Sequence, residues 1–178
     1  MSKVKLCIIT TIDGYIATPD GGLDWLTDSF SEHLGYEYRK FLAEIGTVIM
    51  GRQTYRNLLC MDIVWPYKDK VTYIISHSLI GEKSNENIHC ITENTIEKIE
   101  KMKEGKGSDI GLVGGGVLTK TLLQHDLIDE MIISTVPMLL GGGISLFPSS
   151  FPISNWHIEK TELLKNGVMQ TTYCKSTP

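Results

Sequence analysis

Two segments place glycine and polar residues where an apolar run meets the start of a helical pattern. In "TVIMGRQTYRNLL" the apolar run ends at Met50, and Gly51, Arg52, Gln53 and Thr54 follow it. The N-terminus of a helix presents unpaired backbone N–H groups and the positive end of the helix dipole, which together attract phosphate. Arg52 adds a planar guanidinium that matches phosphate oxygens. This segment is a candidate phosphate site.

The segment "IGLVGGGVLTK" has the same construction. Its apolar run is followed by Gly114, Gly115 and Gly116, and Val117 and Leu118 open the next helical pattern. Missing side chains would let a pyrophosphate approach the backbone. Two such sites suit a dinucleotide, which has several phosphates. The alternative is that the glycines only permit tight turns from strand to helix.

Neither segment completes an established nucleotide motif. The glycine triplet lacks the third glycine of G-x-G-x-x-G and lies in the middle of the chain, whereas a Rossmann domain has the motif after its first strand. A P-loop counted from Gly111 fails as well, because Val117 stands where lysine is required. The sequence therefore predicts a nucleotide site of another kind.

Short apolar segments rich in β-branched residues predict the strands that position these turns. They are Val4–Ile12, Thr47–Met50, Val71–Ser76, Ile88–Ile91, Ile110–Val113 and Ile128–Val136. Helical patterns lie between them. Strands that alternate with helices indicate a mostly parallel sheet with helices on its faces.

The first helix has the clearest pattern. Ser29 and Glu32 have the spacing of a capping box. An apolar stripe follows at Leu34, Tyr38, Phe41, Leu42 and Ile45. Three more helices are expected: one from about Gly51, one over Ile96–Met102 with Asn94 and Glu97 at its start, and one over Val117–His125.

The C-terminal region has a β pattern without helices. "WHIEKTELLK" and "VMQTTYCK" are joined by Asn166-Gly167, the dipeptide that favours a two-residue type I′ hairpin. We therefore expect one α/β domain over residues 1–178, with a mostly parallel central sheet, flanking helices and a C-terminal antiparallel hairpin.

Composition excludes several classes of function. A net charge of -4 and a pI near 5.7 give no electrostatic signature of nucleic-acid or anionic-membrane binding. No apolar run is long enough to span a membrane, and the N-terminal apolar run is interrupted by threonines, which indicates a strand and not a signal peptide. The four cysteines and five histidines show no metal-ligand spacing. We expect a cytoplasmic protein with reduced thiols and no metal.

Six segments in order carry a resemblance: "TTIDGYIA", "GLDWL", "VIMGRQTYRNL", "IISHS", "LVGGGVLTKTLL" and "PMLLGGGISLFP". From about Lys3 to Tyr173 the chain resembles the dihydrofolate reductase-like fold, which has three layers. It is most similar to the reductase domain of the bifunctional riboflavin-biosynthesis deaminase-reductase. No deaminase segment with zinc-ligand cysteines is seen. The resemblance implies NADPH as cofactor, a small-molecule substrate and a homodimer.

The resemblance also implies cofactor-binding residues. Gly51, Arg52, Gln53 and Thr54 are expected to hold phosphates, with Arg52 on the adenosine 2′-phosphate. Ser76, His77 and Ser78 are expected near the adenosine, although His77 has the alternative of an exposed loop residue. The pyrophosphate is expected at Gly114, Gly115, Gly116, Val117 and Leu118. Ile9, Ile16 and Ala17 are expected to line the nicotinamide site.

The substrate end departs from the folate reductases. Their helix carboxylate corresponds to a position near Gly35 here, and Glu37 is the nearest acid. Glu37 is a candidate catalytic residue or a solvated flank glutamate. Asp13 either orients the substrate or serves the turn before Gly14. Trp25 either closes a lid formed by residues 13–28 or packs at the surface.

In the resemblance, Gly142 and Ser145 approach the substrate. The leading hypothesis is an NADPH-dependent reductase of a small heterocycle, most like 5-amino-6-(5-phosphoribosylamino)uracil reductase. The alternatives are a dihydrofolate reductase, which the absent helix carboxylate disfavours, and a nucleotide-binding module without catalysis.

Overall fold

The computed structural model of the chain describes residues 1–26, 28–61, 63–78, 86–165 and 167–176, without the side chains of residues 28–34. Its strands are β1 Val4–Thr11, β2 Tyr15–Ala17, β3 Ile45–Gly51, β4 Val71–Ile75, β5 Ile88–Ile91, β6 Asp109–Val113, β7 Glu130–Val136, β8 Ile144–Ser145, β9 Trp156–Leu163 and β10 Met169–Lys175. Its helices are α1 Asp28–Glu44, α2 Arg52–Cys60, α3 Thr95–Glu104 and α4 Gly116–Gln124.

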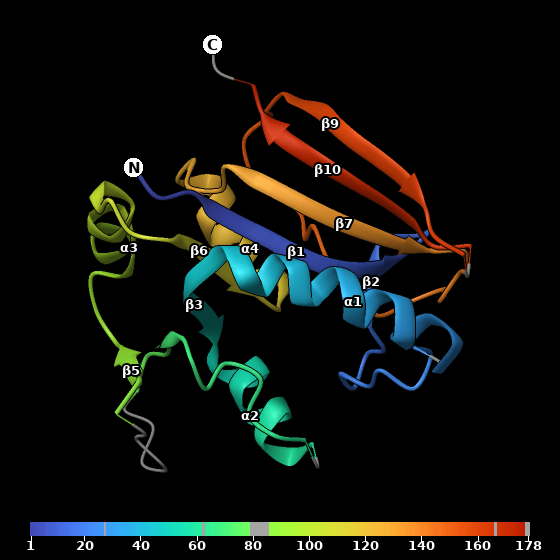
Figure 1. The fold of residues 1–178 in the computed structure, drawn as a ribbon, viewed down its shortest axis with the longest axis horizontal. Helices are drawn as coiled ribbons and strands as arrows, with labels where there is room; N and C mark the ends of the chain where they lie inside the picture. The colour runs from blue at the N-terminus through green and yellow to red at the C-terminus, as the bar shows by residue number, and fades with distance from the viewer. Residues whose placement is uncertain (27, 62, 79–85, 166, 177–178) are drawn as a thin grey trace.

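An eight-stranded sheet forms the centre of the molecule, in the order β5-β4-β3-β6-β1-β7-β10-β9 (Figure 1). In this order the first six strands run parallel to one another, and the last two, β10 and β9, add antiparallel pairs at the β7 end. This arrangement confirms the expected α/β fold with a mostly parallel sheet and a C-terminal antiparallel hairpin.

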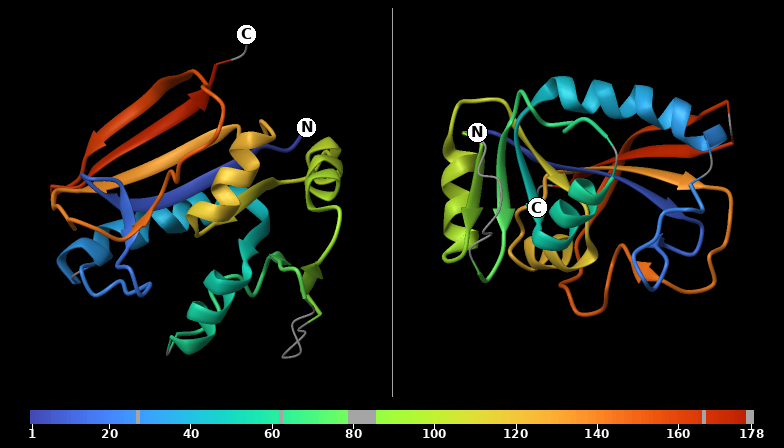
Figure 2. Two further views of the ribbon diagram at one scale, coloured as in Figure 1. Left: turned by 180° about the vertical axis from the view of Figure 1, so that it is seen from behind. Right: turned by 90° about the horizontal axis from the view of Figure 1, so that it is seen from below.

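Two apolar clusters fill the space between the sheet and its helices. On one face, Phe41 of α1 and Tyr55 of α2 pack with Val48, Met50 and Ile74 of the sheet. On the other face, the cluster contains Ile99 of α3 and Leu118 and Leu122 of α4. Figure 2 shows α3 and α4 in front when the molecule is seen from behind, with α1 on the far side. The fold therefore has three layers.

The predicted helices are found within one or two residues of their expected ends. Helix α1 begins at Asp28, and the side chains of the expected capping box lie outside the described residues. Phe41 and Ile45 of the predicted stripe are buried, with Tyr38 and Leu42 packed against them. Among the described residues no helix is both long enough and apolar enough to span a membrane.

A short second sheet, which the sequence did not predict, joins β2 and β8. Tyr15 pairs with Ser145, and Ala17 pairs with Ile144. Strands of three and two residues are too short to show an alternating pattern, which explains why they were missed. This sheet fastens the segment after β1 to the segment after β7.

The C-terminal hairpin is confirmed, but its predicted two-residue turn is wrong. Leu164 N–H donates to the Val168 carbonyl at 2.8 Å, and Gly167 N–H donates to the Leu164 carbonyl at 3.0 Å. The connection therefore spans three residues, 165–167, with Gly167 at a φ of +82°. Such a turn also requires glycine in the left-handed region, so the same dipeptide suits both turn lengths. Asn166 itself lies outside the described residues.

Candidate functional site

The two predicted phosphate turns lie next to each other. Strands β3 and β6 are parallel neighbours, and Met50 pairs with Val113 at their carboxyl ends. The residues that follow, Gly51 and Gly114, therefore leave the sheet at the same edge. A Cβ atom on Gly114 would lie 2.3 Å from Oγ1 of Thr54 in α2. The chain thus brings two segments sixty residues apart in sequence into direct contact.

The glycines of the two turns face different surroundings. Gly114 has a φ of +84°, and its missing side chain makes room for Thr54. A Cβ on Gly116 would lie 2.4 Å from the carbonyl oxygen of Ser145. In contrast, none of the described atoms lies within 4 Å of a Cβ on Gly51, and on Gly115 the nearest of them would be 4.0 Å away. Packing within the chain thus accounts for Gly114 and Gly116 and leaves Gly51 and Gly115 open.

The two open glycines stand at helix N-termini. Gly51 is the N-cap of α2 and Gly115 is the N-cap of α4, and a glycine at this position has no side chain that could accept from the first-turn N–H groups. The first-turn N–H groups are therefore available to an anion. Val117, in the first turn of α4, is exposed, and Leu118 is buried in the core. These features fit a cofactor that carries phosphates at two points.

Arg52 extends this site towards the end of β4. Its Nη1 donates to Ser78 Oγ at 2.6 Å, so the predicted phosphate and adenosine segments meet. Ser78 N–H donates to Oγ of Ser76, which is buried, whereas His77 is exposed. The Nε of Arg52 is buried and has no partner among the described residues. A buried guanidinium nitrogen without an acceptor fits a site for an anionic group.

The predicted nicotinamide residues lie where β1 turns back into β2. Ala17 is buried, whereas Ile9 and Ile16 are partly buried and pack against different apolar clusters. Thr10 Oγ1 donates to the Tyr15 carbonyl at 3.1 Å. Strand β1 is the parallel neighbour of β6, so Ile9 lies towards the same carboxyl edge of the sheet as the glycine turn that follows β6.

Asp13 anchors the loop that follows β7. Its carboxylate accepts hydrogen bonds from the hydroxyl of Thr11 at 2.5 Å, from Leu140 N–H at 3.1 Å and from Gly141 N–H at 2.8 Å. The Thr11 hydroxyl first, and then the two N–H groups, hold the pKa of this carboxyl below its ordinary value. Asp13 thus serves the turn before Gly14 and holds the backbone at Leu140 and Gly141.

The segment from β7 to β8 is fastened to the same turn. A Cβ on Gly143 would lie 2.2 Å from the carbonyl oxygen of Ala17. Ser145 pairs with Tyr15 in the short sheet. Gly142 is open, because no atom in the described part of the chain lies within 4 Å of a Cβ placed on it. Of the two candidate substrate residues, Ser145 joins β8 to β2 through its backbone pairing with Tyr15, and Gly142 faces open space.

Trp25 is an interior residue. It is 8% exposed and packs with Val136 and Val168, while Ile9 borders the same cluster. Its indole Nε1 is buried without a partner in the described part of the chain. The segment before it also reaches α2, because a Cβ on Gly21 would lie 3.9 Å from Asn57 Nδ2. Residues 13–26 therefore bridge β1 and α2 over the sheet edge.

Sequence reasoning did not single out Asn57. Its Oδ1 accepts a hydrogen bond from Gln53 Nε2 at 2.8 Å, and its side chain faces Gly21. The only signal in the sequence was its i+4 spacing from Gln53 on a predicted helix. Asn57 thus orients a predicted cofactor residue and lies beside Gly21.

Glu37 lies apart from these groups. Its carboxylate pairs with Lys40 at 2.9 Å. It lines a pocket of about 170 Å³ together with Phe41, Ile132, Gln170, Thr172 and other residues of α1 and β9, and none of the predicted cofactor residues borders this pocket. The structure therefore does not bring Glu37 together with Gly51 and Gly115.

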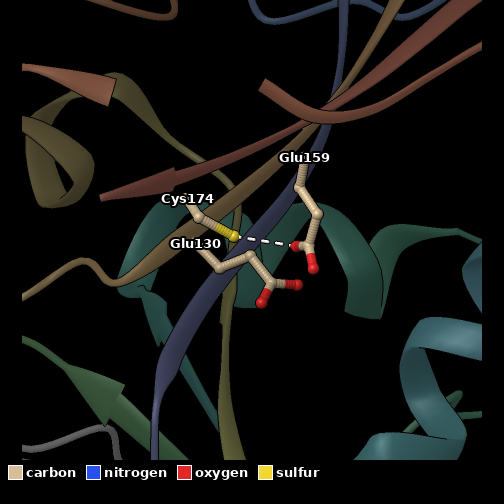
Figure 3. Close-up of side chains that lie close together, drawn as sticks. All are labelled: Glu130, Glu159 and Cys174. Atoms are coloured by element: carbon tan, nitrogen blue, oxygen red, sulfur yellow. Dashed lines mark hydrogen bonds between the residues drawn. The ribbon is translucent and has the colours of Figure 1, made fainter. Parts of the chain in front are cut away.

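A third group of side chains has metal-ligand chemistry. Glu130, Glu159 and Cys174 converge from β7, β9 and β10, as Figure 3 shows, with ligand atoms within 4.8 Å of one another. The Cys174 thiol donates to Glu159 at 2.9 Å. Lys3 and Lys5 each lie 3.6 Å from Glu130, so ammonium groups already offset its charge. The trio does not require a metal ion.

The comparisons with known proteins show the family of this chain. A model of the family described as "RibD C-terminal domain" matches residues 2–170. The uncharacterized protein YwjB of Bacillus subtilis (strain 168) is 37% identical over 145 residues, which are 82% of each chain. A putative riboflavin biosynthesis protein from Shewanella sp. PV-4 is 28% identical, with a TM-score of 0.86 over 98% of this chain and 99% of that one.

A more distant structure shows the fold alone. The dihydrofolate reductase from Enterococcus faecalis, in complex with NADP(H), has a TM-score of 0.70 and 18% identity, and the match covers 98% of this chain and 97% of that one. The expected dihydrofolate reductase-like fold is therefore confirmed.

Proposed function

Because the chain belongs to the RibD C-terminal domain family, we propose that it is an NADPH-dependent oxidoreductase that reduces a small heterocyclic substrate. The substrate most in keeping with the family is 5-amino-6-(5-phosphoribosylamino)uracil. The protein acts in the cytoplasm as a homodimer, without nucleic-acid or membrane partners.

One observation carries the cofactor assignment: two helix N-termini, at Gly51 and Gly115, lie at the same sheet edge, and no described atom comes closer than 4.0 Å to a Cβ placed on either glycine. Thr54 sets the separation of the two turns by packing on Gly114. A pair of preset N–H clusters fits a ligand with several phosphates. Gly114, Gly115, Gly116, Val117 and Leu118 hold the pyrophosphate in this proposal.

Arg52 provides the preference for NADPH over NADH. Its guanidinium lies beside Ser78, and its buried Nε lacks an acceptor among the described residues. A 2′-phosphate would supply that acceptor and a compensating charge. Gln53 is held by Asn57, and Ser76 holds Ser78, so the neighbouring polar groups are fixed before a ligand arrives.

A reduced nicotinamide supplies a hydride when it is bound. The chain's own residues position the reactants and exclude water. Ile9, Ile16 and Ala17 give the nicotinamide an apolar surface. Asp13 holds the segment containing Gly142 in place through Leu140 and Gly141. Trp25 fixes residues 13–26 by packing with Val136 and Val168. Neither Asp13 nor Glu37 is proposed as the proton donor.

The dihydrofolate reading is the second candidate among enzymes. Its support is the fold shared with a folate reductase that binds NADP(H). Against it, the expected helix carboxylate falls near Gly35, and Glu37 lies in a separate pocket. The remaining candidate is a nucleotide-binding module without catalysis, which would bind the cofactor but not turn over a substrate.

Two measurements distinguish these readings. The first is the melting temperature with NADPH, with NADH and without ligand. A ligand at a hundred times its dissociation constant stabilises the folded protein by about 2.7 kcal/mol. We expect the larger shift with NADPH, and no shift with either nucleotide contradicts the cofactor assignment.

The second measurement is the near-ultraviolet absorbance of the reduced cofactor, with the aminouracil phosphate and dihydrofolate supplied separately. We expect oxidation with the aminouracil phosphate. Oxidation only with dihydrofolate supports the second candidate. Cofactor binding without oxidation of either substrate supports the binding module.

A further inference from the structure

The trio of Glu130, Glu159 and Cys174, here named the Glu–Cys cluster, lies at the far end of the sheet from the predicted cofactor turns. Glu130 is the first residue of β7. Strand β7 runs parallel to β1, β6 and β3, whereas the two glycine turns follow the carboxyl ends of β3 and β6. The cluster is therefore separate from the cofactor site.

Strand pairing places two members of the cluster in one row. Glu130 and Cys174 are Cα partners across β7 and β10, and Cys174 and His157 are Cα partners across β10 and β9. Facing residues of paired strands project to the same side of the sheet. A carboxylate, a thiol and an imidazole thus come from three consecutive strands on one face.

A bulge in β9 adds the third member. Ile158 pairs with Tyr173 and Lys160 pairs with Thr172, so Glu159 is the extra residue on β9. A bulge redirects the side chain of such a residue. Here the Glu159 carboxylate accepts a hydrogen bond from the Cys174 thiol at 2.9 Å, and Figure 3 shows the three side chains converging.

The separations within the cluster suit one metal ion. Bonds of about 2.3 Å from zinc to sulfur and about 2.0–2.2 Å from zinc to oxygen put neighbouring tetrahedral ligand atoms about 3.3–3.7 Å apart. The three ligand atoms lie within 4.8 Å of one another, and the pair of Cys174 and Glu159 lies at 2.9 Å. Small side-chain movements would bring all three into the coordination range.

Glu130 is the member whose surroundings point to a ligand. Its side chain is only 10% exposed, and among the described residues it accepts no hydrogen bond. Its two ion pairs, with Lys3 and Lys5, are both 3.6 Å long, which exceeds hydrogen-bond length. Buried carboxylates are normally hydrogen-bonded or bound to a metal ion. The Glu130 oxygens therefore still have the capacity to bind one.

The two lysines differ in how firmly they are held. Lys5 is 9% exposed and is fixed by Glu44 at 2.8 Å and by Asp109 at 3.1 Å. Lys3 is 55% exposed, and Glu130 is its only ion-pair partner among the described residues. An arriving cation can displace Lys3 without disturbing Lys5. The lysines explain why the fold does not require an ion, and the mobility open to Lys3 leaves room for one.

The cluster is accessible from solvent. Glu159 and Cys174 line an open pocket of about 660 Å³, together with His157 and Asp129. An ion can therefore reach these two ligands directly. Three protein ligands leave a fourth position for water, and an imidazole borders the same pocket.

The ligand set selects zinc among the common divalent ions. Calcium and magnesium prefer sites made entirely of oxygen atoms. A thiolate with carboxylates suits Zn²⁺, which accepts sulfur, nitrogen and oxygen ligands in a tetrahedron. The sequence spacing gives no sign of this site, because its ligands come from three different strands.

We propose that the Glu–Cys cluster binds one Zn²⁺ through Cys174 Sγ and one carboxylate oxygen each of Glu130 and Glu159, with water in the fourth position. The ion replaces the thiol proton, which passes to solvent. It joins β7, β9 and β10, and so fastens the C-terminal hairpin to the parallel part of the sheet. This site is independent of the proposed cofactor site.

The first test is titration of the full chain with Co²⁺, which occupies tetrahedral zinc sites and absorbs light. A thiolate ligand gives a charge-transfer band in the near ultraviolet. We expect this band to saturate at one Co²⁺ per chain and to disappear on addition of Zn²⁺. Cys174→Ser should abolish the band, whereas Cys60→Ser, at an exposed cysteine elsewhere, should retain it.

The second test is the Zn²⁺ dissociation constant, measured by competition with a colorimetric zinc chelator. Residues that only support a metal ligand cost about 10–100-fold in affinity when they are replaced. Glu159→Gln removes a direct ligand and should raise the dissociation constant by about a hundredfold or more. Glu100→Gln, at an exposed glutamate of α3, is the matched control and should leave it unchanged.

Three results would overturn the proposal. They are a parent spectrum without a thiolate band, a band that Cys60→Ser removes and Cys174→Ser retains, and an affinity that Glu159→Gln and Glu100→Gln change equally. Melting curves recorded without metal check that each variant is folded. Added Zn²⁺ should raise the melting temperature of the parent but not that of Cys174→Ser, because a ligand stabilises only the folded state that binds it.

Discussion

The Thr54 side chain of α2 occupies the space where Gly114 would otherwise carry a Cβ atom, with Oγ1 only 2.3 Å from that position. The contact joins the two segments that the sequence marked as separate phosphate sites. It fixes how far apart two helix N-termini stand at the edge of the sheet. Because this spacing is set in the folded chain, ligand binding does not have to include the free-energy cost of ordering the turns.

Gly114→Ala should therefore damage the fold, whereas Gly51→Ala should not. Alanine at position 114 meets Thr54 and requires a φ of +84°, so we expect a loss of about 1–3 kcal/mol in the free energy of unfolding. Alanine at position 51 adopts the φ of -75° freely, and its methyl group meets no atom of the described residues within 4 Å. Urea unfolding measures both variants.

The Gly114→Ala and Gly51→Ala variants also separate an effect on stability from an effect on ligand binding. Gly51→Ala places a methyl group where a phosphate is proposed to approach, so it should weaken NADPH binding in a protein of normal stability. Calorimetric titration of the folded variants measures this. Unchanged affinity for Gly51→Ala would show that no ligand approaches that backbone.

Arg52→Ala should weaken NADPH more than NADH. Hydrogen bonds to charged groups contribute about 1.5–3 kcal/mol, which corresponds to roughly a tenfold to hundredfold loss for NADPH. Arg56→Ala, an exposed arginine on the same helix, is the control. An equal loss for both nucleotides would remove Arg52 from the 2′-phosphate site.

Asp13→Asn should lower the melting temperature at neutral pH and have little effect in acid. The Thr11 hydroxyl and the N–H groups of Gly141 and Leu140 keep the pKa of the Asp13 carboxyl below its ordinary 3.8 in the folded chain. A depressed folded pKa contributes stability above the unfolded value, and this contribution disappears as the pH falls through the folded value. The two melting curves should therefore begin to converge as the pH falls below about 3.8 and meet below the folded pKa.

Asp24→Asn, in the same segment and exposed, serves as the comparison for Asp13→Asn. If the melting temperatures of the Asp13 variant and the parent differ by the same amount from neutral to acid pH, the ionised carboxylate of Asp13 is not what anchors Leu140 and Gly141.

The cysteines should differ in reactivity at mildly alkaline pH. Burial, with a smaller effect of Glu37, raises the pKa of the Cys7 thiol to about 12, and burial followed by Glu159 raises that of Cys174 to about 11. The thiolate is the reactive form, and its fraction falls about tenfold for each pH unit below the pKa. Maleimide labelling followed by mass spectrometry should find exposed Cys60 modified first. Early labelling of Cys7 would contradict this placement.

Local patterns in the sequence were sufficient for most of the elements. The stripe from Tyr38 to Ile45 and the glycine at position 51 predicted α1 and the start of α2, because helix periodicity and helix starts depend on neighbouring residues. The hairpin was predicted for the same reason. Its turn length was not, because a glycine with positive φ serves turns of two and three residues alike, and the hydrogen bonds of Leu164 decide between them.

The site was predicted only in part. Sequence spacing and resemblance indicated both glycine turns and Arg52, but which glycines are open depends on contacts between distant segments: Thr54 against Gly114 and Ser145 against Gly116. The same holds for Asp13, whose carboxylate is occupied by backbone groups more than a hundred residues away.

The sequence by itself thus determined the alternation of strands and helices, the hairpin and the two turns that could face a phosphate. Tertiary structure decided that the turns touch, that Glu37 lies in a different pocket, and that Glu130, Glu159 and Cys174 converge. The physical reason is the distance along the chain over which each property is determined. Backbone conformation follows from nearby residues, whereas a side chain's neighbours and free space follow from how the sheet brings remote strands together.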